Sequence, residues 1–376
     1  MSGIYIHIPF CKKACFYCDF HFSVSFKIKE NIIIAICQEL TSRKDFFDSK
    51  ETISSIYFGG GTPSILSIKE IDEILGVVYS HYNVEKNAEI TFECNPDDLS
   101  RDYFRELKFV GINRLSIGVQ SLNDEHLKWM NRSHDASQSK KSIEYAAEAG
   151  FNNITLDLIY GLPQLGDKEW SDSLKEALNL PINHLSAYNL TMEENTPYIK
   201  LVNQGKYKKP SDDNSSGHYQ ILVQQTRDLG WEHYEVSSFC KPGNYSKHNS
   251  SYWSGKKYLG VGPSAHSYDG ISRHWNVSNN QSYLEFISSG NRSFETEKLT
   301  INNQMNEYLL TGLRTKWGVD LKLLSDKYNY NVASIFEEDI KYWTSLNWLE
   351  MKNSKMKLTD KGMLFADHIS STLFMS

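Results

Sequence analysis

Short hydrophobic runs alternate with amphipathic stretches over about the first 200 residues of the chain. The hydrophobic runs are rich in β-branched and aromatic residues and predict six strands, at 3–8, 54–58, 88–93, 114–120, 153–160 and 184–190. Helical patterns such as 67–79 and 135–149 lie between them, the second starting at an Asp cap and ending before a glycine. Strands that alternate with helices indicate an α/β fold with a parallel sheet and right-handed crossovers. Because a closed barrel of this kind needs eight strands, we expect a partial (β/α)6 TIM-like barrel with a lateral opening.

The alternation stops near residue 203, after which the chain changes character. A polar connector at 206–216 leads into a region rich in Tyr, Trp, His and Gly, which runs to about residue 291. The last block has helical patterns followed by a hairpin pattern at 348–358. We therefore expect three regions: a barrel (1–202), an α+β extension (203–299) and a small winged-helix-like C-terminal domain (300–376).

Composition and charge exclude several classes of protein. Of the 376 residues, 40% are hydrophobic and 23% are charged, which is typical of a soluble globular protein. The net charge of −6, and equal numbers of basic and acidic residues in 305–376, argue against nucleic-acid binding. No run of about 18 apolar residues predicts a membrane span, and the N-terminus does not resemble a secretory signal. The scattered cysteines outside the first 20 residues suggest a reducing, cytoplasmic location.

Three closely spaced cysteines near the N-terminus are the strongest chemical signal. Cys11, Cys15 and Cys18 have the spacing C-x3-C-x2-C and follow the first predicted strand. Three thiolates leave one iron of a 4Fe–4S cluster without a protein ligand, and an open iron can bind a reactant. Two other interpretations remain open. The cysteines could be unrelated buried thiols, or they could bind zinc, although His21 is then the only nearby fourth ligand.

Polar residues and glycines follow the later predicted strands. In a parallel barrel these strand ends share one rim, so we expect their side chains to meet there. Glycines allow close backbone approach, carboxylates accept hydrogen bonds from hydroxyl or ammonium groups, and an arginine can grip a carboxylate. A structural turn for the glycines and solvated surface positions for the charges are the alternatives. The candidates are Gly60, Gly61, Thr62, Glu93, Gln120, Arg132 and Asp157.

Together these motifs resemble the radical S-adenosylmethionine (radical SAM) superfamily, in particular its coproporphyrinogen oxidase-related branch. The resemblance implies a partial barrel of the radical SAM type, with a 4Fe–4S cluster on the three cysteines. It further implies that the open iron chelates SAM, which one-electron transfer cleaves to a 5′-deoxyadenosyl radical. The positions that match SAM-site residues of the family are Tyr5, Tyr17, Gly60, Gly61, Thr62, Glu93, Gln120, Arg132 and Asp157.

Two departures separate the chain from the oxygen-independent coproporphyrinogen III oxidases of that branch. Phe20 stands where those oxidases have a fourth cysteine, and only ten residues precede Cys11. Both departures are shared by the relatives called HemW, which are haem chaperones. The chain also matches the H-N-x-x-Y-W signature that the resemblance links with haem, at His248, Tyr252 and Trp253, while His266 is a second candidate ligand. Alternatively, His248 caps a loop and the aromatic residues fill core.

The resemblance implies a haem chaperone that binds haem and passes it to haem-accepting proteins, respiratory proteins among them. Cluster and SAM would then shape the protein, for instance by promoting a homodimer. An oxygen-independent coproporphyrinogen III oxidase is the second hypothesis, and a radical SAM enzyme with an unrelated substrate is the third. The residues alone leave open whether the protein is an enzyme.

Overall fold

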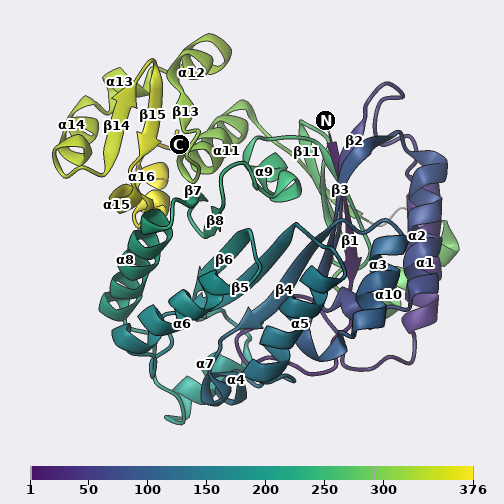
Figure 1. Ribbon diagram of the computed structural model, residues 1–376. Helices are drawn as coiled ribbons and strands as arrows, with labels where there is room; N and C mark the ends of the chain where they lie inside the picture. The colour runs from purple at the N-terminus through teal and green to yellow at the C-terminus, as the bar shows by residue number, and fades with distance from the viewer. Residues whose placement is uncertain (1, 291–293, 376) are drawn as a thin grey trace.

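Six parallel strands lie in chain order across the centre of the sheet in the computed structural model (Figure 1). The structure describes residues 2–290 and 294–375, so residues 1, 291–293 and 376 of the three predicted regions lie outside the described residues. All six predicted strands are confirmed, with small shifts at their ends. They are β1 (Ser2–Ile8), β2 (Ile53–Gly60), β3 (Val84–Cys94), β4 (Arg114–Gln120), β5 (Ile154–Tyr160) and β6 (His184–Asn189).

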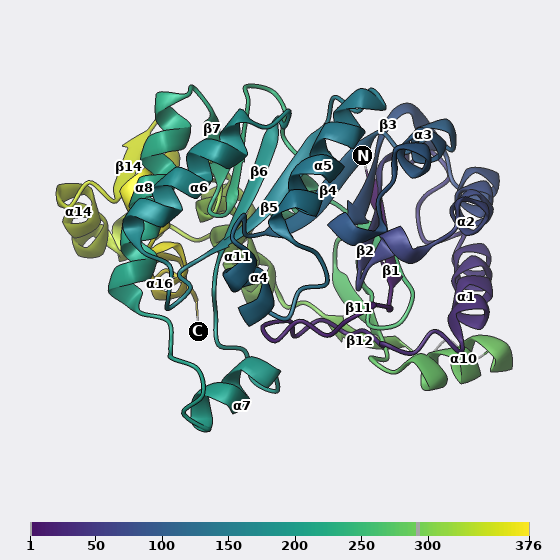
Figure 2. The same cartoon turned by 60° about the horizontal axis from the view of Figure 1, so that its bottom comes forward.

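Helices connect these strands and cover the outer face of the sheet (Figures 1 and 2). They are α1 (Lys29–Ser42), α2 (Ile68–His81), α3 (Arg101–Phe109), α4 (Asp124–Trp129), α5 (Ala136–Glu148) and α6 (Asp167–Asn179), with short 3-10 turns η1 (Pro63–Ile65) and η2 (Pro96–Asp98). Capping boxes start α2 and α5, where Ser67 and Asp135 accept hydrogen bonds from the first-turn N–H groups of Glu70 and Gln138. Within the described residues, no helix has the length and apolar content needed to cross a membrane.

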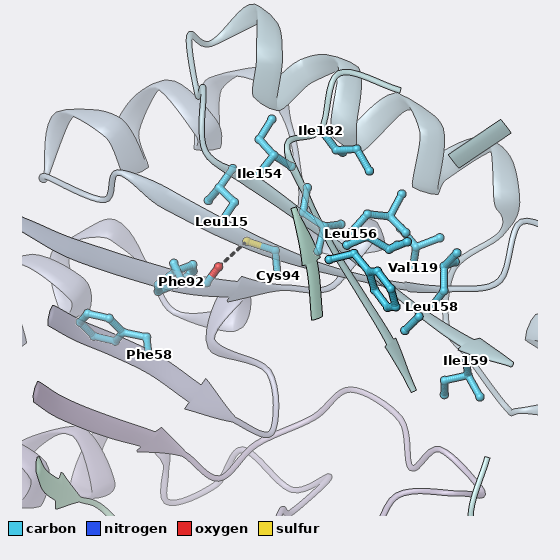
Figure 3. Close-up of a cluster of buried hydrophobic side chains, with 14 of the residues drawn as sticks. Phe58, Phe92, Cys94, Leu115, Val119, Ile154, Leu156, Leu158, Ile159 and Ile182 are labelled. Carbon is cyan, nitrogen blue, oxygen red and sulfur yellow. Dashed lines mark hydrogen bonds between the residues drawn. The ribbon is translucent and has the colours of Figure 1, made fainter. Parts of the chain in front are cut away.

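Alternation along the strands gives the sheet two different faces. Ile4, Ile6 and Ile8 of β1 are fully buried and alternate with Tyr5 and His7. The apolar side chains of neighbouring strands form a continuous layer, part of which Figure 3 shows: Phe58, Phe92, Cys94, Leu115, Leu156 and Leu158. The residues between them in sequence are mostly polar and gather on the inner, concave face. The sheet therefore combines an apolar outer face with a polar interior.

The extension after β6 does not form a separate layer but lengthens the same sheet at both edges. The strand order is β12-β11-β10-β9-β1-β2-β3-β4-β5-β6-β8-β7, and β9 pairs in parallel with β1. The added strands are β7 (Glu232–Glu235), β8 (Ser238–Cys240), β9 (Tyr258–Val261), β10 (His266–Tyr268), β11 (Ser272–Asn276) and β12 (Phe294–Lys298). The helices of this region are α7 (Pro197–Asn203), α8 (Asp212–Asp228), α9 (Lys247–Trp253) and α10 (Asn280–Ser289).

The C-terminal region is a set of helices around a small antiparallel sheet, in agreement with the predicted hairpin. Its strands pair in the order β13-β15-β14: β13 (Val319–Asp320), β14 (Leu349–Lys352) and β15 (Lys355–Leu358). Its helices are α11 (Ile301–Leu313), α12 (Leu321–Tyr328), α13 (Val332–Ile335), α14 (Glu337–Ser345), α15 (Asp360–Met363) and α16 (Ala366–Thr372). Arg314 ties the region to the large sheet through an ion pair with Glu235, at 3.1 Å. A second ion pair joins Arg273 of β11 to Glu307 of α11, at 2.9 Å.

Candidate functional site

The cysteine loop follows β1 and lies at the carboxyl ends of the parallel strands. Neighbouring segments hold it by backbone hydrogen bonds, since Cys11 N–H donates to the Ser23 carbonyl at 3.0 Å and Phe16 N–H to the Met130 carbonyl at 3.1 Å. Figure 2 shows this loop, in purple, running past α4 and α7. All three cysteines line one cavity of about 740 Å³, which we call the cysteine cavity.

Hydrogen-bond donors reach two of the three sulfur atoms. The Thr62 hydroxyl donates to Cys11 Sγ, and Arg132 Nη1 donates to Cys15 Sγ, each at 3.3 Å. Burial raises the pKa of Cys11 to about 11 and that of Cys18 to about 12. A metal centre ionises such thiols, because its positive charge offsets the cost of burying a thiolate. No group of three His, Cys, Asp or Glu side chains in the described ranges could hold a single metal ion. Three thiols spread around one cavity, two of them with donors in place, fit a cluster ligated at separate corners.

The glycine loop after β2 brings a second backbone segment against the cysteine loop. Gly60 has a φ of +106°, a conformation that side-chain-bearing residues rarely adopt. A Cβ on Gly61 would lie 2.6 Å from the Phe10 carbonyl oxygen, and the Gly61 N–H donates to the Ile8 carbonyl at 2.8 Å. The glycines therefore permit a close approach of the two loops, and with Thr62 they line the cysteine cavity.

Two carboxyl groups lie deep in the same cavity, on the concave face of the sheet. Glu93 accepts a hydrogen bond from the Tyr57 hydroxyl at 2.7 Å, and Asp157 accepts one from Ser116 at 3.1 Å. Burial, together with the nearby Asp157 charge, raises the pKa of Glu93 to about 8. Burial likewise raises the pKa of Asp157 to about 6. A cationic ligand in the cavity would favour the ionised form of both groups, so the site is suited to an ammonium or sulfonium group.

Arg132 and Gln120 complete the polar wall of the cysteine cavity. Arg132 Nη2 donates to the Gly118 carbonyl at 2.8 Å and also to the side chain of Asn95. Its Nε is buried and has no hydrogen-bond partner within the described residues, so one donor of the guanidinium remains available. Gln120 has a φ of +66°, and strained backbone of this kind concentrates at functional sites.

Most of the candidate residues are thus brought together in the cysteine cavity. Besides the three cysteines, the lining includes Tyr17, Gly60, Gly61, Thr62, Glu93, Gln120, Arg132 and Asp157. Five candidates lie elsewhere: Tyr5, His248, Tyr252, Trp253 and His266. Tyr5 projects from the same concave face, and its ring stacks on Tyr57 with centroids 6.0 Å apart.

His248 belongs to α9, which packs against β1, β2 and β3 (Figure 1), and its ring lies beside Gly3 and Ser55 near the amino ends of β1 and β2. Its side chain is buried, with 1% of its surface exposed. Nδ1 is hydrogen-bonded with the Ser55 hydroxyl at 2.9 Å, and Nε2 with the Tyr252 hydroxyl at 2.8 Å. Burial lowers the pKa of His248 to about 3. In this structure His248 is a neutral core residue whose two nitrogens are both engaged.

A second cavity, of about 790 Å³, lies on the other side of the cysteine loop. We call it the aromatic cavity, after lining residues that include Tyr5, Phe20, Tyr252, Trp253, Tyr258 and His266. Asp19 and Phe20 line both cavities, so this short piece of the cysteine loop is a wall between them. Tyr5, Tyr252 and Trp253 therefore share a cavity that is separate from that of the cysteines.

The sequence patterns missed the contribution of the C-terminal region. Arg314, Met363 and Leu364 line the cysteine cavity, while Tyr308 and Tyr328 line the aromatic cavity. No local spacing marks these residues, because tertiary packing of the C-terminal region brings them to the cavities. The ion pairs that join the C-terminal region to the large sheet give no local sequence signal either, because their partners are far apart in the chain.

Comparison with known proteins gives first the class that this fold and cysteine site define. The Radical SAM superfamily profile matches residues 5–177, and the HemN C-terminal domain profile matches residues 299–365. The solved structure of coproporphyrinogen III oxidase (HemN) from Escherichia coli has the same fold, with a TM-score of 0.84 and 24% identity over 100% of this chain and 90% of that one. The protein is a member of the radical SAM superfamily.

Within that superfamily, the chain belongs to the HemW family. It is 33% identical to heme chaperone HemW of Bacillus subtilis over 98% of both chains. It is 30% identical to heme chaperone HemW of Mycobacterium tuberculosis H37Rv, over 99% of this chain and 94% of the relative. The mitochondrial radical S-adenosyl methionine domain-containing protein 1 of Danio rerio is 28% identical over 100% of this chain and 87% of its own.

Proposed function

We propose that the protein is a haem chaperone that binds haem, transfers it to haem-dependent proteins and carries a SAM-coordinated 4Fe–4S cluster. The observation that carries this proposal is the aromatic cavity beside the cysteine cavity, with Asp19 and Phe20 between them. A cavity of about 790 Å³ lies within the usual range for small-molecule sites and is large enough for a porphyrin. The HemW relatives carry the name heme chaperone, which agrees with such a cargo.

The cysteine cavity supplies the groups that a cluster and SAM require. Cys11, Cys15 and Cys18 would hold three corners of the cluster, with Thr62 and Arg132 donating to the sulfur atoms. When bound, the cluster supplies an iron with an open coordination position. The carboxyl groups of Glu93 and Asp157 would face the cationic part of SAM. The free Nε of Arg132 is available to a carboxylate.

The position of Phe20 supports a chaperone over an oxidase. Phe20 stands where the oxidases carry a fourth cysteine, and 67% of the surface of this residue is exposed at the wall between the cavities. A phenyl ring there adds apolar surface to the aromatic cavity and offers no thiolate. Phe20 is therefore better suited to pack against a ligand than to take part in redox chemistry.

The test is an anaerobic assay that offers both activities to the same preparation. The reconstituted protein receives SAM, a reductant and coproporphyrinogen III in one arm, and haem followed by apo-myoglobin as acceptor in the other. We expect haem to bind and to pass to apo-myoglobin, with no protoporphyrinogen formed. Stoichiometric conversion of coproporphyrinogen III would establish the oxidase instead, and absence of haem binding would refute the chaperone.

The proposed function also implies partners and a location. Haem-accepting proteins, including respiratory proteins, would be the macromolecular partners, and reduced cysteines agree with cytoplasm. A homodimer promoted by cluster and SAM would appear in size-exclusion chromatography as a shift on reconstitution. A mass that stays constant with and without both groups would remove dimerisation from the proposal.

A further inference from the structure

The imidazoles around the aromatic cavity differ in whether their nitrogens are free. Both nitrogens of His7 are hydrogen-bonded, Nδ1 with the Tyr5 hydroxyl at 3.2 Å and Nε2 with the His21 carbonyl at 2.9 Å. His21 uses Nε2 for the Asn280 side chain at 2.7 Å. His248 has no free nitrogen and does not line the cavity. Neither ring nitrogen of His266 is hydrogen-bonded in the part of the chain that the structure describes.

His266 is also the imidazole that the fold presents most openly to this cavity. It lies on β10, is exposed, and lines the cavity wall. Its ring stacks on Trp275 of the paired strand β11, with centroids 6.0 Å apart and ring planes at 23°. Its backbone is packed tightly against β9, where a Cβ on Gly260 would lie 2.0 Å from the His266 carbonyl oxygen. A strand so constrained holds the ring in position for a ligand.

The surroundings of His266 fit a flat ligand with anionic edges. Tyr252 and Tyr258 meet edge to face with centroids 4.5 Å apart and give the cavity an aromatic wall. Lys256, Arg273 and Lys327 also line it. Arg273 is ion-paired with Glu307 at 2.9 Å, and Asp19 is the other acidic group of the lining. The ammonium groups of Lys256 and Lys327 therefore remain available to form ion pairs with the two propionates of a haem.

We propose that haem lies in the aromatic cavity with the imidazole of His266 as an axial ligand of its iron, and that His248 is a positioning residue. This assignment rests on the proposed function, because it gives the location and ligation of the same cargo. His248 then acts through Tyr252, whose hydroxyl it holds at 2.8 Å and whose ring lines the cavity. In the H-N-x-x-Y-W segment, Tyr252 thus forms part of the aromatic wall and His248 holds it in place. The ligand to the iron comes from β10.

The experiment is a haem titration of the cluster-loaded, full-length protein, followed by absorption and resonance Raman spectroscopy of the axial ligand. The variants are His266→Ala, His248→Ala and His248→Gln, with the exposed His81→Ala as a matched control. We expect His266→Ala to weaken haem binding about tenfold or more and to lose the imidazole signature. Added free imidazole should restore that signature, because it fills the space of a missing ligand but does not repair a damaged fold.

Both His248 variants should retain the imidazole signature at saturating haem, and iron and sulfide contents report whether each variant is folded. His248→Gln is included because it keeps a hydrogen-bonding side chain in a buried position. Loss of the signature in a folded His248 variant, or its survival in His266→Ala, would overturn the assignment. Failure of the unmodified protein to bind haem would instead refute the proposed function, so the two failures are distinguishable.

Discussion

The two cavities of this protein are similar in volume and share a wall, yet their linings differ in kind. The cysteine cavity is lined by thiols, carboxyl groups and Arg132 at the ends of parallel strands, together with Arg314 of the C-terminal region. The aromatic cavity has many rings in its lining, from β1, the cysteine loop, α9, β9, β10, α11 and α12, together with charged groups such as Lys256 and Arg273. Buried ionisable groups favour charged ligands and chemistry, whereas rings favour flat apolar ligands through packing. Asp19 and Phe20 line both cavities, so a change in one cavity can be tested for its effect on the other.

Replacing Cys15 by Ala should have the largest effect, and it should be confined to one cavity. The change removes one of the three proposed thiolate ligands, so we expect complete loss of cluster iron and sulfide. Haem affinity should fall less than about tenfold, because Cys15 does not line the aromatic cavity. Metal analysis and haem titration measure the two effects. Cys37→Ala, in α1, is the matched control and should keep the cluster. A parallel loss of haem binding in Cys15→Ala would show that the cavities are not independent.

Glu93→Gln should remove a pH dependence that belongs to the cysteine cavity. The folded pKa of Glu93 is raised to about 8 from 4.5, so between these values the folded state keeps a proton that the unfolded state has released. The stability of the cluster-free protein should therefore fall as pH rises through this window, by a few kcal/mol in order of magnitude. Thermal unfolding at pH 5, 6.5 and 8 should show a smaller fall in Glu93→Gln. The exposed Glu106→Gln should follow the unmodified protein, and an equal fall in all three would remove Glu93 as the cause.

His248→Ala tests whether His248 stabilises the protein core behind the aromatic cavity. The buried ring packs on Tyr57 with centroids 5.0 Å apart and forms two hydrogen bonds. Its removal should cost about 2–4 kcal/mol, since it leaves a void and unpaired hydroxyl groups. A lower midpoint in urea unfolding is the expected result, while the exposed His81→Ala should leave it unchanged. An unchanged midpoint in His248→Ala would contradict its place in the core.

A pair of glycine substitutions gives the smallest effects and opposite signs. Gly61→Ala puts a Cβ about 2.6 Å from the Phe10 carbonyl oxygen, which should cost about 1–3 kcal/mol and weaken SAM binding. Gly76→Ala, in the middle of α2, meets nothing within 4 Å and should raise stability by about 1 kcal/mol. Unfolding midpoints and SAM titration measure both variants. If Gly61→Ala were as stable as Gly76→Ala, the glycine loop would have to accommodate the new Cβ without a cost in unfolding free energy.

The residues that line the cysteine cavity could be predicted from the sequence far better than those that line the aromatic cavity, and the reason is physical. Residues such as Glu93 and Asp157 come from strands whose hydrophobic patterns are local, and parallel strand ends must share a rim. The aromatic cavity instead draws on residues from Tyr5 to Tyr328. Its assembly depends on the pairing of β9 with β1 and on docking of α11 and α12, neither of which has a local pattern. The hydrogen bonds that occupy His248 are equally non-local, because Ser55 lies on β2.

The pairing of β1 with both β2 and β9 has a consequence for how the protein is made. A ribosome releases β1 about 250 residues before its second partner strand, which begins at Tyr258. At typical translation speeds this interval lasts roughly 10–50 s. Throughout that time one edge of a strand that carries three isoleucines has no partner on the nascent chain, and such edges invite aggregation. A folding helper that shields this edge during synthesis should therefore raise the soluble yield of the protein more than one added after release.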